Sequence, residues 1–194
     1  NKFKSVKLKI CGVTNIETLN FLIDKKVEFF GLIFYKKSPR SINLIDALNL
    51  VKLIDGTQTN AVGVFVDCPL IEIRNYISKL KLKYIQLHGN ENNKYIEKIK
   101  NDNSKVKIIK SIGLNNKNDL NMINEIKSAD YFLFDYKSKI ITDLPGGNSK
   151  KMDWKLLKNL NISTKWFLAG GINESNITEA INALNPYGID ISSG

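Results

Sequence analysis

Three side chains that can exchange protons stand where short apolar runs end. Cys11 and His88 each close such a run, and Asp135 follows four consecutive apolar residues. Apolar surroundings raise the pKa of a carboxyl group, which suits Asp135 to general-acid work. A thiol before a glycine and near a helix start favours the thiolate, and so a base, although Cys11 could equally be a small buried apolar residue. His88 is the only histidine, so it is either structural or part of a site without a histidine-based metal cluster.

Other residues at the ends of runs have the chemistry of binding groups. Arg40 lies in a loop and is either a solvated charge or the partner of a carboxylate, which a guanidinium holds with two hydrogen bonds. Gly170 and Gly171 follow one run, and Ser192 and Ser193 follow the last. Backbone N–H groups in such turns, next to a helix start, bind phosphate.

The elements that position these residues alternate along the chain. Short runs rich in β-branched and aromatic residues are separated by stretches of helical periodicity, so we expect eight strands and seven connecting helices. The predicted strands are Val6–Cys11, Phe29–Tyr35, Ala61–Val66, Tyr84–His88, Val106–Ile112, Tyr131–Tyr136, Trp166–Ala169 and Gly188–Ser192. The clearest helical stretches are 16–23, 44–51, 71–80 and 177–184.

This alternation predicts an α/β fold, a (β/α)8 TIM barrel forming one domain over residues 1–194. In such barrels the chemistry lies at the carboxyl ends of the strands, where the residues above are found. An open doubly wound sheet is the alternative, but no G-x-G-x-x-G turn follows the first strand. The sequence stops directly after the eighth strand, so the barrel is expected to be short at its C-terminus and to lack the final helix.

Composition limits the partners. The 194 residues are 43% hydrophobic and 25% charged, and no apolar run is long enough to span a bilayer. The net charge of +10 comes from evenly scattered lysines with only two arginines, a pattern of solvated surfaces rather than of a nucleic-acid interface. A positive field also suits a small phosphorylated substrate. Two cysteines do not make a disulfide framework, so we expect a reducing compartment, the cytoplasm.

Six motifs in order carry a resemblance. They are Lys-Ile-Cys-Gly-Val-Thr (9–14), Ser-Pro-Arg (38–40), Val-Gly-Val-Phe-Val (62–66), Gln-Leu-His-Gly (86–89), Leu-Ala-Gly-Gly-Ile (168–172) and Asp-Ile-Ser-Ser-Gly (190–194). Together they resemble the phosphoribosylanthranilate isomerases of tryptophan biosynthesis over residues 6 to 194. The resemblance implies a cofactor-free Amadori rearrangement of N-(5-phosphoribosyl)anthranilate to 1-(2-carboxyphenylamino)-1-deoxyribulose 5-phosphate.

The resemblance also implies roles. Asp135 would be the general acid at the ribose ring oxygen, and Cys11 the base that takes the proton from ribose C2. Arg40 would bind the anthranilate carboxylate, His88 would support the site, and Asp190 would contact the sugar hydroxyls. The phosphate would meet residues in the turns after strands six, seven and eight: Gly147, Gly170, Gly171, Ser192 and Ser193.

Other interpretations remain open. The chain could be another phosphate-binding barrel of amino-acid biosynthesis, such as an indole-glycerol-phosphate synthase or a histidine-pathway isomerase, although Cys11 with Arg40 argues against both. It could also be a basic nucleic-acid-binding module or an inactive barrel fragment. Whether it acts as a monomer or a homodimer is not decided by the sequence.

Overall fold

Eight parallel strands form a closed barrel, in the order in which they occur along the chain. The computed structural model describes residues 5–136, 154–158 and 160–192. The strands are β1 (Lys7–Cys11), β2 (Phe29–Ile33), β3 (Asn60–Phe65), β4 (Tyr84–Leu87), β5 (Lys107–Leu114), β6 (Tyr131–Tyr136), β7 (Lys165–Leu168) and β8 (Gly188–Ile191). The pairing of β1 with β8 closes the barrel and sets Lys9 opposite Asp190. This confirms the predicted (β/α)8 fold.

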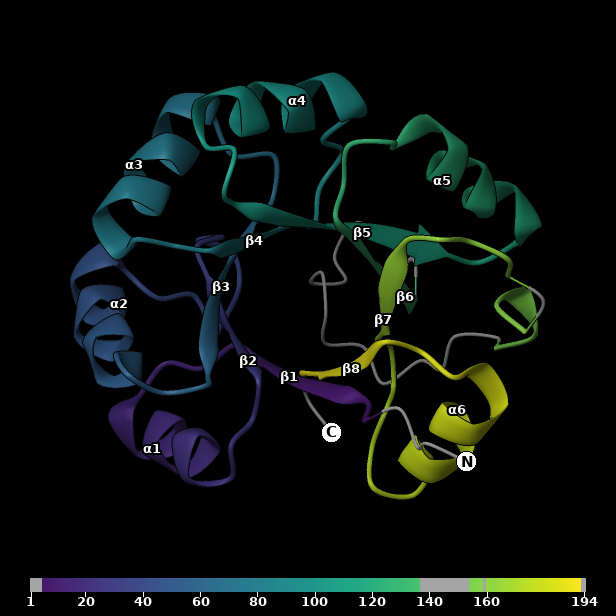
Figure 1. Cartoon of the computed structure of the whole chain (residues 1–194), viewed down its shortest axis with the longest axis horizontal. Helices are drawn as coiled ribbons and strands as arrows, with labels where there is room; N and C mark the ends of the chain where they lie inside the picture. The colour runs from purple at the N-terminus through teal and green to yellow at the C-terminus, as the bar shows by residue number, and fades with distance from the viewer. Residues whose placement is uncertain (1–4, 137–153, 159, 193–194) are drawn as a thin grey trace.

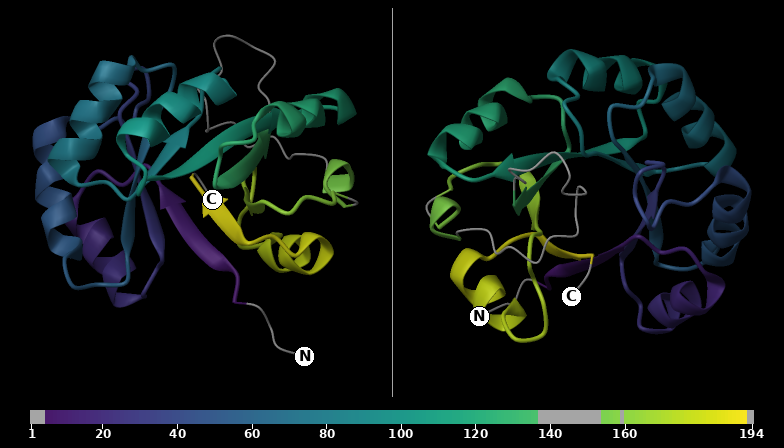
Figure 2. Two further views of the ribbon diagram at one scale, coloured as in Figure 1. Left: turned by 45° about the horizontal axis from the view of Figure 1, so that its top comes forward. Right: turned by 180° about the vertical axis from the view of Figure 1, so that it is seen from behind.

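Helices surround the barrel on its outside (Figures 1 and 2). They are α1 (Ile16–Asp24), α2 (Leu44–Val51), α3 (Leu70–Leu80), α4 (Asn93–Asp102), α5 (Met122–Glu125) and α6 (Ile177–Leu184), with 3-10 turns η1 (Lys52–Ile54), η2 (Lys117–Asn121) and η3 (Trp154–Leu156). Asparagines start three of the helices: the side chains of Asn15, Asn43 and Asn92 each accept a backbone N–H in the first turn. Such caps stabilise a helix by roughly 1 kcal/mol each.

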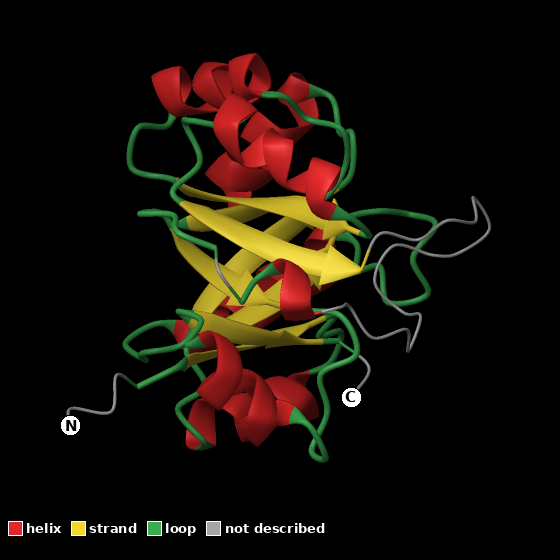
Figure 3. Ribbon diagram, turned by 90° about the vertical axis from the view of Figure 1, so that its right-hand side faces the viewer, coloured by secondary structure: helices red, strands yellow, loops and turns green. Residues whose placement is uncertain are grey.

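The interior of the barrel changes character along its axis. At the end where the strands begin, Phe29, Val62, Leu133 and Phe167 belong to one apolar cluster, in which the Phe29 and Phe167 rings meet edge to face at 5.7 Å. Both faces of such strands are covered, which is why all five residues of β2 are buried. The strands run together toward the other end of the barrel, as the side view shows (Figure 3). The apolar cluster therefore forms the floor beneath their carboxyl ends.

The connections differ in part from the seven expected helices. The α2 and α6 boundaries agree with the predicted stretches, but the β5–β6 connection is η2 followed by the single turn of α5. In the described part of the β6–β7 connection only η3 is found, so the expected helix is wrong there for those residues. No helix follows β8 in the described chain, as expected. None of the described helices is long and apolar enough to cross a membrane.

Candidate active site

The structure places the predicted site residues at one end of the barrel. Cys11 is the last residue of β1, Asp135 lies near the end of β6, and His88 directly follows β4. Asp190 lies in β8, and Arg40 lies in the loop between β2 and α2. Gly170 and Gly171 follow β7, and Ser192 follows β8, whereas Gly147 and Ser193 lie outside the described residues.

Cys11 is buried, with 9% of its surface exposed. Its sulfur lies against Gly31 of β2, where an added Cβ would come within 2.7 Å of Sγ. Burial raises the pKa of the Cys11 thiol, while Lys9 and Arg40 lower it and Asp190 raises it further. The expectation of a lowered thiol pKa is therefore wrong for this structure, because the loss of solvent outweighs the neighbouring cations.

A buried ion pair that we did not predict lies beside Cys11. Lys9 is fully buried, and its Nζ is 2.7 Å from Oδ1 of Asp190. Burial opposes the charge on Lys9, but Asp190 and Cys11 together raise the pKa of Lys9 above its ordinary value. A signal was present in the sequence: Lys9 and Cys11 are two residues apart on one strand, so they share a face.

Arg40 joins the ends of two strands. Its Nη1 donates to the carbonyl oxygen of Cys11 at 3.0 Å and to that of Ser192, and its Nη2 donates to Ser192 Oγ at 2.7 Å. The guanidinium therefore holds the mouth of the barrel together between β1 and β8. A guanidinium has five N–H donors, so a substrate carboxylate would share this group with Ser192.

Asp135 has the protonation behaviour expected of an acid. Burial raises its pKa to about 6, although the backbone N–H of Tyr136 donates to Oδ1 at 2.7 Å and stabilises the carboxylate. Gly170 packs against it: a Cβ on this glycine would lie 2.8 Å from Asp135 Oδ1, and its φ of +82° is also costly for other residues. The raised pKa agrees with the expectation from the apolar run.

His88, directly after the end of β4, faces Asp135 of β6 across the intervening β5, with Nε2 4.0 Å from Oδ2 of Asp135. Burial lowers the pKa of His88 to about 4, and Lys9 and Lys110 act in the same direction, so the ring is neutral at pH 7. Gln86 Nε2 lies 3.0 Å from His88 Nδ1. The amide nitrogen donates, so Nδ1 accepts and the ring proton is on Nε2, the nitrogen that lies nearer Asp135.

The turn after β7 has a backbone conformation that glycine adopts most readily. Gly170 and Gly171 have positive φ angles of 82° and 70° in succession. Asn176, directly before α6, donates from Nδ2 to Gly171 O at 2.8 Å and accepts from the backbone of Asn173 at 2.9 Å. These bonds fix the turn at the start of a helix, where phosphate groups bind.

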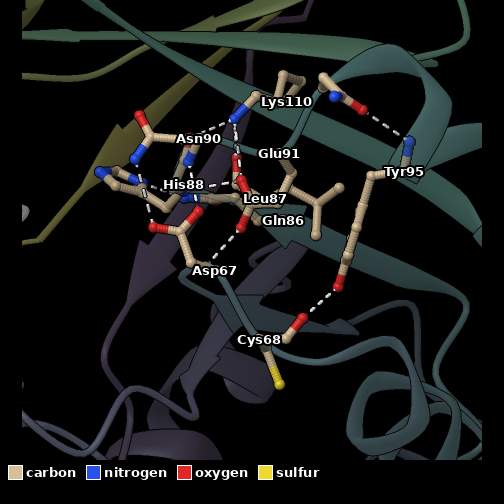
Figure 4. Close-up of polar contacts among 11 residues, drawn as sticks. Asp67, Cys68, Gln86, Leu87, His88, Asn90, Glu91, Tyr95 and Lys110 are labelled. Carbon is tan, nitrogen blue, oxygen red and sulfur yellow. Dashed lines mark hydrogen bonds and ion pairs between the residues drawn. The ribbon is translucent and has the colours of Figure 1, made fainter.

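A second buried network supports the loop that carries His88 (Figure 4). Lys110 Nζ donates to Glu91 Oε2 at 3.0 Å and to Gly89 O at 2.6 Å. Glu91 in turn accepts from the backbone N–H groups of Asp67 and Gly89 at 2.8 and 2.9 Å. The network ties the ends of β3, β4 and β5 together, and the sequence analysis missed it. Among the described residues, no group of three or more His, Cys, Asp or Glu side chains could hold a metal ion.

The fold and the site define a class: a (β/α)8 barrel with acid–base groups and a glycine turn at the catalytic end of its strands. The family model described as N-(5'phosphoribosyl)anthranilate (PRA) isomerase matches residues 8–194. The chain belongs to this family.

Individual relatives agree. The N-(5'-phosphoribosyl)anthranilate isomerase of Thermoanaerobacter sp. (strain X514) is 36% identical over 189 residues, which cover 97% of this chain and 88% of the relative. The crystal structure of phosphoribosyl anthranilate isomerase from Thermotoga maritima superposes with a TM-score of 0.85 at 29% identity, covering 98% of this chain and 89% of the other. An isomerase crystallised with reduced 1-(o-carboxyphenylamino)-1-deoxyribulose 5-phosphate gives 0.81 at 28% identity, with coverage of 98% and 88%.

Proposed function

We propose that the chain is the isomerase that converts N-(5'-phosphoribosyl)anthranilate to 1-(2-carboxyphenylamino)-1-deoxyribulose 5-phosphate in L-tryptophan biosynthesis. Family membership over residues 8–194 supports this, as does the relative that was crystallised with a reduced form of that product. The observation that carries the mechanism is Asp135, a carboxyl group with a pKa of about 6 at the mouth of the same barrel as the Cys11 thiol.

The first step needs an acid. Asp135 would donate its proton to the ribose ring oxygen while the bond between C1 and that oxygen breaks, which leaves a protonated imine at C1. With a pKa of about 6, roughly a tenth of Asp135 is protonated at pH 7, far more than for an exposed carboxyl group. His88 lies beside Asp135, and we propose that its neutral ring orients the Asp135 side chain without placing a positive charge next to it.

The second step needs a base. The Cys11 thiolate would take the proton from C2, an S–H bond forms, and the C2–H electron pair becomes the C1=C2 bond while the imine pair moves to nitrogen. The resulting enolamine then tautomerises to the ketone. The reaction is an intramolecular aldose–ketose isomerisation, and its proton transfers need no cofactor.

The remaining residues would hold the substrate. Arg40 would bind the anthranilate carboxylate, Asp190 would contact the sugar hydroxyls, and the turn at Gly170 and Gly171 would bind the phosphate with Ser192. Gly147 and Ser193 complete the proposed phosphate contacts. The substrate is thus a phosphorylated small molecule. We further propose that the protein is cytoplasmic, since both cysteines are free thiols. It would act as a monomer or homodimer and need neither nucleic acid nor a membrane.

Turnover of N-(5'-phosphoribosyl)anthranilate, followed by loss of its fluorescence, tests the proposal. Cys11→Ser and Asp135→Asn should each lower kcat at least 100-fold, the usual scale of acid–base contributions. Cys68→Ser is the matched control, because it removes the other thiol, which lies near Glu72 rather than in the mouth. Full activity in both site variants would refute the assignment, and a parent chain without any turnover would refute the function.

A further inference from the structure

Lys9 and Cys11 are close neighbours inside the barrel. They alternate with Leu8 and Ile10, whose side chains pack against the outer core that lies under the helices. Lys9 is fully buried and Cys11 nearly so. A lysine in this place is costly, because burying an ammonium group without a partner costs several kcal/mol. Lys9 therefore needs partners in the interior of the barrel if its side chain is to stay charged.

Those partners are Asp190 and the Cys11 thiol. The strand register of β1 and β8 sets Lys9 directly opposite Asp190, and the ammonium–carboxylate distance is 2.7 Å. Lys9 and Cys11 are two residues apart on β1, so these two buried side chains share the inner face of the barrel. The ammonium group therefore has the Asp190 carboxylate opposite it and, on its own strand, a group that becomes anionic only as a thiolate.

The charged groups facing Cys11 come from three elements. Lys9 lies on the same strand, Asp190 on β8, and Arg40 in the loop after β2. On its other side β2 presents Gly31, which carries no charge. Asp135 on β6 interacts with Lys9 and Asp190 rather than with Cys11 directly. Of the two cations, Lys9 is the larger influence on the thiol, ahead of Arg40.

We propose that Lys9 is a positioning residue for the reaction, whose buried ammonium group, fixed by Asp190, stabilises the thiolate form of Cys11 that acts as base. The inference rests on the proposed function for the role of Cys11. Its electrostatic part does not: the charge of Lys9 acts on the thiol whether or not substrate is bound. When Cys11 takes the proton from C2, the sulfur becomes neutral and Lys9 keeps its own proton.

The test is a pH titration of the Cys11 thiolate by its ultraviolet absorbance, with Cys68→Ser as background and Cys11→Ser subtracted. Lys9→Met keeps an unbranched side chain of similar length without the charge. We expect the pKa of Cys11 to rise by about one unit or more, the scale of a neighbouring opposite charge. The low-pH limb of kcat/KM should move to higher pH by the same amount.

Lys110→Met is the matched control. Lys110 is also fully buried and also paired with a carboxylate, that of Glu91, but the neighbours of its side chain are the β4 end and Glu91 rather than Cys11. It should leave the thiol titration unchanged. A Cys11 pKa that stays the same in folded Lys9→Met would overturn the proposal even if the parent chain turns substrate over. A shifted titration in a chain without turnover would instead reject the proposed function and keep the electrostatic role.

Lys9→Gln carries the test if Lys9→Met does not fold, as circular dichroism would show. Its amide is polar and uncharged, and Asp190 stays in place, so the Cys11 titration should again move to higher pH. An unchanged or lowered Cys11 pKa in folded Lys9→Gln would overturn the proposal.

Discussion

Asp135 combines an acid's chemistry with a cost in stability. Its side chain is 14% exposed, and burial raises its pKa from 3.8 to about 6. The folded state therefore binds this proton more tightly than the unfolded state does. Between about pH 4 and pH 6 folding retains a proton that the unfolded chain releases, so the free energy of unfolding falls as the pH rises through this interval. In the mechanism proposed above, the proton of this carboxyl group is the one that the reaction uses, which accounts for an unfavourable carboxylate at neutral pH.

Asp135→Asn should therefore stabilise the fold at pH 7 while it removes activity. Asn keeps the Oδ1 acceptor for the Tyr136 N–H and carries no charge, so the free energy of unfolding should rise by roughly 1–3 kcal/mol at pH 7. The difference should vanish below about pH 4, where the parent carboxyl group is neutral in both states. Urea unfolding at several pH values measures it. An Asn variant less stable than the parent at pH 7 would contradict the raised pKa.

Substitution of Gly31 tests how precisely the Cys11 sulfur, the proposed base, must be positioned for turnover. A Cβ there would lie 2.7 Å from Cys11 Sγ and 3.1 Å from Cys11 Cα, so Gly31→Ala must displace the sulfur or the strand. A displacement of about 1 Å can cost 100-fold in rate, whereas overpacking costs about 1–3 kcal/mol of stability. We expect kcat to fall at least tenfold in a variant that still folds. Gly56→Ala is the control for kcat, because no atom lies within 4 Å of a Cβ there and its φ of +73° gives it a cost in stability away from the sulfur. Equal kcat in the two variants would show that the sulfur tolerates movement.

The positions of the strand ends explain how much of the candidate site could be predicted from the sequence. Cys11, His88 and Asp135 were singled out because parallel strands bring their carboxyl ends to one edge, whatever the loops between them do, whereas Asp190 came from the family resemblance. The pairing of Lys9 with Asp190 was not found, because it depends on which strands meet when the barrel closes. The thiol pKa was predicted in the wrong direction for the same reason: a single sequence shows the residues near a thiol but not how much water they exclude.

The connections were less predictable than the strands. Strand boundaries agree within one or two residues, since buried apolar runs leave little choice. The β5–β6 connection was expected to be a helix, but Asn116 caps η2 with a capping box to Asp119, and only one turn of α5 follows. Local hydrogen bonds from asparagine and aspartate compete with a longer helix. The buried Glu91 was missed because its partners include Lys110 on β5 and the backbone of Asp67 after β3, which are far from it along the chain.

The loop network around Glu91 should be a stability element rather than part of the chemistry. Glu91→Gln leaves Lys110 buried without its counter-charge, and removing one partner of a buried pair costs about 3–5 kcal/mol. Arg74→Ala breaks the exposed Arg74–Asp102 pair and should cost at most about 1 kcal/mol. Urea unfolding of both variants gives the comparison. Similar small losses would mean that the network does not hold the ends of β3, β4 and β5.

The barrel as a whole is not uniformly paired. The β5 and β6 strands pair over six positions, from Ile109–Tyr131 to Leu114–Tyr136, whereas β7 and β8 pair only at Phe167–Gly188 and Leu168–Ile189. The weak ladder is also where the proposed phosphate turn, at Gly170 and Gly171, meets the end of β8. Local opening costs least where few backbone hydrogen bonds must break. Ligand binding should therefore change the dynamics most at this seam.

Amide hydrogen exchange with and without inorganic phosphate tests this expectation. In the free protein, amides of β7 and β8 should exchange faster than those of β5 and β6, because their opening breaks fewer ladder bonds. A ligand that binds only the closed form stabilises it by about 2.7 kcal/mol at 100 times its Kd, so saturating phosphate should slow exchange at the seam about 100-fold. Sodium chloride at equal ionic strength is the control, since it screens charges without occupying the turn. Protection spread evenly over all eight strands, or equal protection by chloride, would place the phosphate elsewhere than between β7 and β8.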